Sequence, residues 1–117
     1  MNDEQDRIFR ETEADHFFER NRAFLEKKHY ASEDLPLRIM EMYNLRPGSV
    51  LEIGAATGYR LAAIHELYGR DIRAVAIDAS EKAVAEGKRL FPDVEFCCCP
   101  ATDIPYQEPF EMVIVHS

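Results

Sequence analysis

A turn of small residues (54–58, the glycine turn) is the part of the sequence best suited to chemistry. The stretch 49–54 predicts a short buried strand ending at Gly54, and Ala55 and Ala56 lead from it to Gly58, near the predicted start of a helix. Such a turn brings backbone N–H groups close to a ligand and lets the ligand lie against the main chain. It is not a phosphate-binding P-loop, because no Gly-Lys-Ser/Thr follows it.

A carboxylate is predicted to lie beside the glycine turn. The next predicted strand leads into Asp78, which comes twenty residues after Gly58. A carboxylate at the carboxyl end of the neighbouring parallel strand can accept hydrogen bonds from both hydroxyl groups of a ribose. The turn and Asp78 together predict a pocket for an adenosine-containing cofactor.

The charge of Glu52 indicates which cofactor this is. A dinucleotide site usually has the pattern G-x-G-x-x-G, which places bare backbone against a pyrophosphate. Here the spacing is Gly54-x-x-x-Gly58, and Glu52 precedes Gly54 by two residues. A carboxylate would repel a pyrophosphate but suits an ammonium and a sulfonium group, which favours S-adenosyl-L-methionine. A nicotinamide-dependent oxidoreductase or epimerase remains the alternative.

With these features the sequence resembles the class I S-adenosylmethionine-dependent methyltransferases. Their first motif is similar to residues 52–58, with Ala56 where a middle glycine is usual. The resemblance implies that Asp78 binds the ribose and that Ala79 lies beside the adenine. It also implies that the cofactor is contacted by Glu52, Gly54, Ala55 and Gly58.

Two later motifs extend the resemblance toward the end of the chain. The sequence Ala-Thr-Asp-Ile-Pro resembles the third motif of the family, which contributes Thr102, Asp103 and Ile104. There Asp103 would accept from the adenine amino group and Ile104 would pack on the ring. Residues 110–113 resemble the fourth-strand motif, and His116 falls where the family faces the methionine portion and the methyl group. No catalytic residue is assigned and no metal ligand is expected.

The elements that must position these residues alternate between strand and helix. Beyond the first strand, strands are predicted at 72–77, 94–97 and 110–115, and helices at 57–68 and 80–90. This order, with short connections, implies a Rossmann-like α/β fold whose parallel sheet carries helices on both faces. The α/β core is assigned to residues 46–117. An amphipathic helical cap is assigned to residues 1–45, and its last helix begins after Asp34.

Composition excludes several classes of protein. A chain of 117 residues forms one domain, and its net charge of −8 argues against a nucleic-acid partner. The acidic start and the absence of a long uncharged apolar stretch argue against secretion and against a membrane span. The three adjacent cysteines, Cys97 to Cys99, fit neither a disulfide framework nor a metal site. We therefore expect a cytoplasmic protein.

The fourth predicted strand lacks a partner for its far edge. It is apolar on both faces, yet the sequence stops two residues after it. We expect the missing C-terminal half of a longer protein, or the second chain of a dimer, to cover that edge. The predicted function is methyl transfer from S-adenosylmethionine to a small-molecule acceptor by in-line displacement, for which these 117 residues alone need not suffice. A non-catalytic half-domain that pairs with a partner chain is the second alternative.

Overall fold

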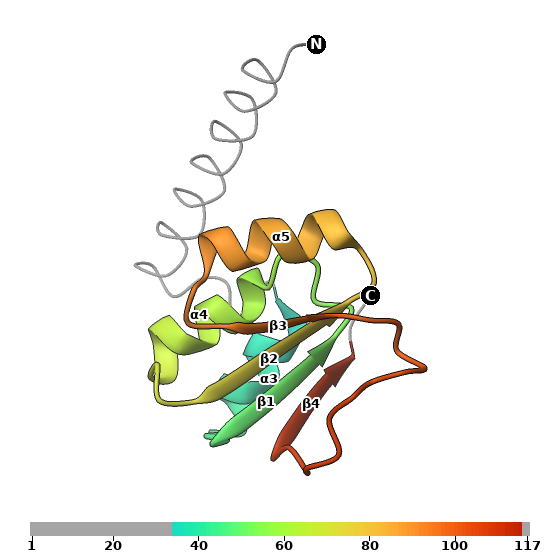
Figure 1. The fold of residues 1–117 in the computed structure, drawn as a ribbon. Helices are drawn as coiled ribbons and strands as arrows, with labels where there is room; N and C mark the ends of the chain where they lie inside the picture. Colours follow the sequence, from blue (N-terminus) through green and yellow to red (C-terminus); the bar gives the residue numbers. More distant parts are fainter. Residues whose placement is uncertain (1–33, 116–117) are drawn as a thin grey trace.

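The computed structural model describes residues 34–115, so the predicted helices before Asp34 and the predicted site residue His116 lie outside the described residues. Within that range, helices and strands alternate as the sequence predicts (Figure 1). The elements are α3 (Leu35–Met42), β1 (Ser49–Ile53), α4 (Tyr59–Tyr68), β2 (Arg73–Asp78), α5 (Glu81–Leu90), β3 (Glu95–Cys98) and β4 (Met112–Val115).

The helix boundaries follow from local capping chemistry. The Asp34 carboxylate accepts from the Leu37 N–H at 3.1 Å and caps α3, and the Ser80 hydroxyl caps α5 by accepting from the Ala83 N–H at 3.2 Å. Gly69 ends α4 with a φ of 123°, as the sequence predicts. The helix α4 begins at Tyr59, two residues later than predicted, because the turn still includes Thr57 and Gly58.

The four described strands form one parallel sheet in the order β3-β2-β1-β4. The chain moves in one direction from β1 to β3 and then returns across the sheet to place β4 on the other side of β1. The strand order therefore reverses between β1 and β4. In open parallel sheets, ligands bind outside the carboxyl ends of the strands at such a reversal point.

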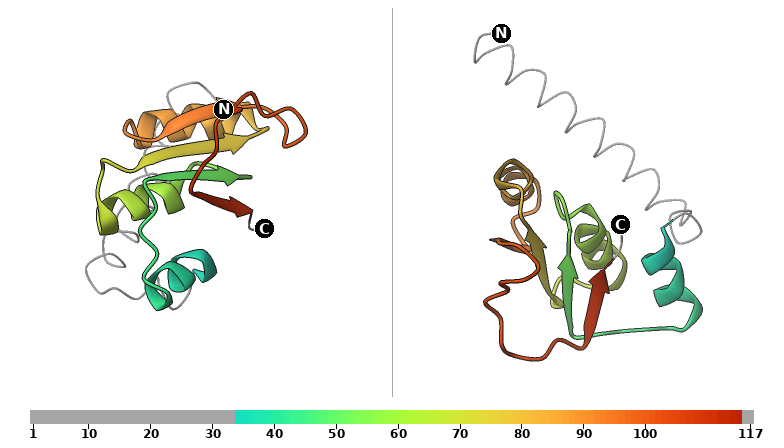
Figure 2. Two further views of the ribbon diagram at one scale, coloured as in Figure 1. Left: turned by 90° about the horizontal axis from the view of Figure 1, so that it is seen from below. Right: turned by 90° about the vertical axis from the view of Figure 1, so that its right-hand side faces the viewer.

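The two faces of the sheet are covered differently. On one face, Val50, Ala74 and Ala76 pack against Met40 of α3 and Leu61 of α4. On the other face, residues of the long connection between β3 and β4 pack against the sheet instead (Figure 2). The contacts on this second face join Leu51, Val75 and Ile77 to Ile104, Tyr106 and Phe110.

This arrangement follows from the handedness of parallel connections. Crossovers between parallel strands are right-handed, so α4 and α5, which link strands laid down in one direction, lie on one face. The return to β4 runs in the opposite direction and therefore crosses the other face. The sequence predicts helices on both faces; in the described part, the second face carries an irregular segment.

The strand β4 is shorter than predicted and partly uncovered. It begins at Met112, because the preceding Glu111 instead ties β4 to β1: its N–H donates to the Ser49 hydroxyl and its carboxylate accepts from the Gly48 N–H. On β4, Ile114 is buried on the helix face, whereas Val113 and Val115 are 52% and 73% exposed.

Candidate functional site

The glycine turn is held in its shape by its own backbone. Gly54, Ala56 and Gly58 all have positive φ angles, of 76°, 53° and 81°. The N–H groups of Gly54 and Ala55 donate to the carbonyl of Ile77 at 2.8 and 2.9 Å, and the Gly58 N–H donates to Ala55. These donors are therefore used inside the protein. The sequence predicts backbone N–H groups close to a ligand; in the structure these three N–H groups are bonded within the protein, and the turn offers a ligand a close approach to the backbone.

Ala56 adopts a conformation that glycine would adopt more readily. A left-handed φ places the Cβ of a non-glycine residue near the following carbonyl oxygen, at a cost of about 1–2 kcal/mol. Ala56 stands where a glycine is usual in the motif, and its φ of 53° shows that the alanine accepts this geometry. The hydrogen bonds of the turn therefore maintain its shape, even where the conformational preference of a residue opposes it.

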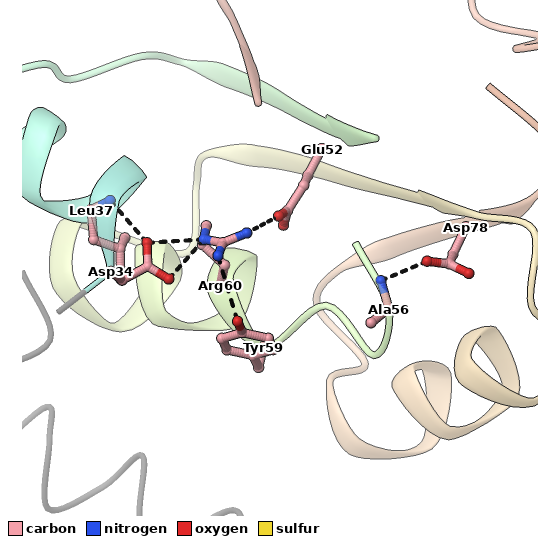
Figure 3. Close-up of polar contacts among 7 residues, drawn as sticks. All are labelled: Asp34, Leu37, Glu52, Ala56, Tyr59, Arg60 and Asp78. Atoms are coloured by element: carbon pink, nitrogen blue, oxygen red, sulfur yellow. Dashed lines mark hydrogen bonds and ion pairs between the residues drawn. The ribbon is translucent and has the colours of Figure 1, made fainter. Parts of the chain in front are cut away.

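Asp78 joins the glycine turn to the start of α5. Its Oδ2 accepts from the Ala56 N–H at 2.8 Å, and its Oδ1 accepts from the Ser80 N–H at 2.9 Å. Asp78 is the last residue of β2 and is partly exposed. Since each carboxylate oxygen has a second acceptor position, Asp78 can hold the turn and still accept hydrogen bonds from a ligand. The predicted pairing of the turn with Asp78 is thus present (Figure 3).

Glu52 lies beneath the site rather than at its mouth. Its side chain is on the helix face of β1, only 1% exposed, and its Oε2 accepts from the Arg60 guanidinium. The Arg60 Nε in turn donates to both oxygens of Asp34, at 3.0 and 2.9 Å. We call Asp34, Glu52 and Arg60 the buried charge cluster (Figure 3). Sequence reasoning missed Arg60; the signal available was a carboxylate inside an apolar strand with an arginine in the next helix.

Burial and pairing act in opposite directions on the groups of this cluster. Burial raises the pKa of the Glu52 carboxyl, and the opposing attraction of Arg60 does not cancel the rise. Burial alone lowers the pKa of Arg60, but Glu52 and Asp34 outweigh it and raise that pKa above its ordinary value. Among the residues described, Glu52 Oε1 is a buried side-chain atom without a hydrogen-bond partner.

The segment that follows β3 begins next to Asp78. The Cys99 N–H donates to the Asp78 carbonyl at 3.1 Å, and the exposed Cys98 thiol lies 3.6 Å from the Ala79 carbonyl. Thr102 and Asp103 are exposed, whereas Ile104 is half-buried against the second face of the sheet. The residues predicted to contact the adenine thus follow two neighbouring strands, β2 and β3. Part of the Ile104 side chain packs in the core and is not available to a ligand.

The three cysteines are free thiols. Burial and the neighbouring Cys97 raise the pKa of the Cys99 thiol to about 11, which disfavours its reactive thiolate. Within residues 34–115, no group of three or more His, Cys, Asp or Glu side chains could hold a metal ion. Over the same residues, no helix is long and apolar enough to cross a bilayer.

A family model described as "Methyltransferase domain" matches residues 50–117, which include the glycine turn, Asp78 and the segment after β3. The chain belongs to this methyltransferase family. The match agrees with the resemblance to class I S-adenosylmethionine-dependent methyltransferases found in the sequence. No curated protein matches the chain significantly.

Solved methyltransferase structures share the fold. The plantazolicin methyltransferase BpumL in complex with SAH (S-adenosylhomocysteine) matches with a TM-score of 0.58 and 19% sequence identity. Its complex with a pentazolic desmethylPZN analog and SAH matches with a TM-score of 0.57 and 18% identity. These matches cover 95% and 90% of this chain but only 41% and 40% of those chains. At this sequence identity, the likeness supports the Rossmann-like α/β fold. This chain spans less than half the length of those neighbours.

Proposed function

We propose that this chain binds S-adenosylmethionine and forms part of a methyltransferase that acts on a small organic acceptor. The observation that carries the proposal is the contact of Asp78 with the backbone of the glycine turn, at 2.8 Å, at the carboxyl ends of β2 and β1. The strand order reverses on the other side of β1. Family membership supports the same activity. The bound cofactor supplies a methyl group already activated on a sulfonium, so the protein has to orient the acceptor for in-line displacement.

The residues present fit such a cofactor. Asp78 has acceptor positions left for the two ribose hydroxyls, and the glycine turn permits close approach. The unpartnered Oε1 of Glu52 belongs to a cluster with surplus negative charge, which favours a cationic ligand. The further proposed contacts are Gly54, Ala55, Gly58, Ala79, Thr102, Asp103, Ile104 and, outside the described residues, His116.

The acceptor is proposed to be a small molecule and not a nucleic acid. The net charge of −8 opposes binding to a phosphate backbone. The chain spans 41% of BpumL, so an acceptor site formed with further protein is part of the proposal. The exposed Val113 and Val115 lie on the second face of the sheet at β4, and they support a covering segment or partner chain there. The adjacent free thiols support a cytoplasmic location.

Calorimetric titration with S-adenosylhomocysteine tests the proposal. The wild-type chain should bind saturably, and Asp78→Ala should weaken binding about 100-fold, since two hydrogen bonds to a charged group are lost. Asp78→Asn, which retains an acceptor oxygen, separates the loss of charge from the loss of the turn's anchor. Asp93→Ala is the matched control, because Asp93 is an exposed carboxylate that pairs only at the surface with Arg70.

Circular dichroism of each variant shows whether the fold is retained. A folded wild-type chain that binds no S-adenosylhomocysteine, or an Asp78→Ala variant that binds it as well as wild type, would contradict the proposal. Binding of a reduced nicotinamide cofactor instead would favour the oxidoreductase alternative.

A further inference from the structure

The buried charge cluster has an unequal number of charges. Among the described residues, two carboxylates pair with the guanidinium of Arg60. The side chains of Asp34, Glu52 and Arg60 are 13%, 1% and 7% exposed. With all three groups ionised, the cluster carries a net charge of −1 (one positive and two negative groups). Tyr59 also faces it, with its hydroxyl 3.5 Å from the Arg60 guanidinium.

A buried charge excess acts more strongly on its surroundings than a surface one. The effective dielectric constant around a buried group is lower than in water, so its field is screened less by solvent and salt. Glu52 lies on β1 two residues before Gly54, the first residue of the glycine turn. Glu52 therefore lies on the strand that leads directly into the loop where the cofactor is proposed to bind.

The two forms of the proposed cofactor differ in charge. S-adenosylmethionine carries a sulfonium, an ammonium and a carboxylate, for a net charge of +1. After methyl transfer, S-adenosylhomocysteine has a neutral thioether and a net charge of zero. A negative charge beneath the site attracts the first more than the second.

We propose that the buried charge cluster selects the charge state of the cofactor, so that the chain binds S-adenosylmethionine in preference to S-adenosylhomocysteine. Glu52 and Asp34 supply the selective charge, and Arg60 offsets one of them so that the cluster can remain buried. The inference rests on the proposed function. It adds to it a residue set that discriminates substrate from product.

The size of the effect follows from Coulomb's law. Two unit charges about 10 Å apart at an effective dielectric constant of about 20 change a dissociation constant about tenfold. Removing one of the two negative charges should therefore lower the preference for S-adenosylmethionine by about that factor. The effect should be smaller for Asp34, which is the more exposed carboxylate and belongs to the cap of α3.

The experiment measures the affinities of both ligands for the full chain and for three variants by calorimetry. Glu52→Gln removes the buried charge with little change of shape, and Asp34→Asn removes the second charge while preserving a helix cap. Glu66→Gln is the matched control: it makes the same substitution on an exposed residue of α4. The readout is the ratio of the two dissociation constants. Contacts of the transferred methyl group cancel when these ratios are compared between variants.

We expect the preference for S-adenosylmethionine to fall about tenfold in Glu52→Gln, about threefold in Asp34→Asn and not at all in Glu66→Gln. Lowering the pH through the raised pKa of Glu52 should reduce the preference of the wild-type chain more than that of Glu52→Gln. A cluster that only stabilises the fold would weaken both ligands equally and leave the ratio unchanged.

The outcomes separate this inference from the proposed function. If the wild-type chain binds both ligands and Glu52→Gln and Asp34→Asn leave the ratio unchanged, the charge selection is wrong and the cofactor site stands. If the folded wild-type chain binds neither ligand, both proposals are wrong. Because Asp34→Asn tests the same charge from another element, the inference does not depend on the folding of a single variant.

Discussion

The two ends of the parallel sheet each contain an arginine placed between two carboxylates, yet the two arrangements differ in their surroundings. Toward the carboxyl ends of the strands, Arg60 is 7% exposed and pairs with Asp34 and Glu52. At the amino ends, Arg73 is 44% exposed and pairs with Glu95 at 3.4 Å and Glu108 at 2.8 Å. We call Arg73, Glu95 and Glu108 the exposed charge cluster.

The difference shows that the same ionic arrangement can serve two purposes. In the exposed charge cluster, water solvates the charges, and Arg73 also lies over the rings of Tyr106 and Phe110, so the cluster helps to hold the irregular segment on the sheet. In the buried charge cluster, each group depends on the others for solvation. At the carboxyl end of the sheet, removing one member of the buried charge cluster therefore leaves a buried charge without its partner.

Replacing the two arginines should give the largest contrast. Arg60→Met would leave two buried carboxylates without a cation and should lower the free energy of unfolding by about 3–5 kcal/mol. Arg73→Met keeps the apolar stem against the rings and exposes its partners to water, so little loss is expected. Urea denaturation followed by circular dichroism measures both. Equal losses in the free energy of unfolding would show that burial does not determine how much these ion pairs contribute to stability.

Much of the fold could be predicted because its signals are local. The caps at Asp34 and Ser80 and the stop at Gly69 act within one helical turn, and the strands are short apolar runs. The true start of β4 could not be predicted, because it depends on contacts of Glu111 with Gly48 and Ser49, more than sixty residues away. Among the described residues, the irregular segment on the second face is there because of the direction of the return to β4.

The candidate site divides in the same way. The approach of Asp78 to the glycine turn was predictable, because adjacent parallel strands bring their carboxyl ends to one edge. The buried charge cluster was not, because Asp34 and Arg60 meet only when α3 and α4 pack on the same face. The roles of Glu52 and the other predicted cofactor contacts in binding remain predictions.

Adding a methyl group to Gly58, before α4, and to Gly48, before β1, should give a smaller contrast. A Cβ on Gly58 would lie 2.7 Å from the Phe96 ring, at a φ of 81°, so Gly58→Ala should cost about 2–4 kcal/mol. A Cβ on Gly48 would meet the end of the flexible Glu111 side chain at 3.2 Å, so Gly48→Ala should change stability by less than about 0.5 kcal/mol. Thermal denaturation provides the measurement; similar costs would mean that the turn adjusts freely around Phe96.

The smallest contrast is expected from pH, where the two clusters should respond with opposite signs. Burial raises the pKa of Glu52, so the folded state holds the proton of this carboxyl more tightly than the unfolded chain does. The contribution of Glu52 to stability therefore falls as the pH rises above 4.5 through the raised value. Hydrogen bonds to backbone groups and to Arg73 lower the pKa of Glu108, so its contribution is present above 4.5 and is lost as the pH falls through the lowered value. Compared with wild type, Glu52→Gln should therefore gain relative stability with rising pH, by no more than about 1.4 kcal/mol per pH unit. Glu108→Gln should lose relative stability as the pH rises from the lowered value to 4.5, so the two slopes fall on opposite sides of pH 4.5. Denaturation between about pH 3 and 8 covers both ranges and measures both slopes. Slopes of the same sign would show that the attraction of Arg60 outweighs the effect of burial on Glu52, so that the folded state favours the charged form of this carboxyl.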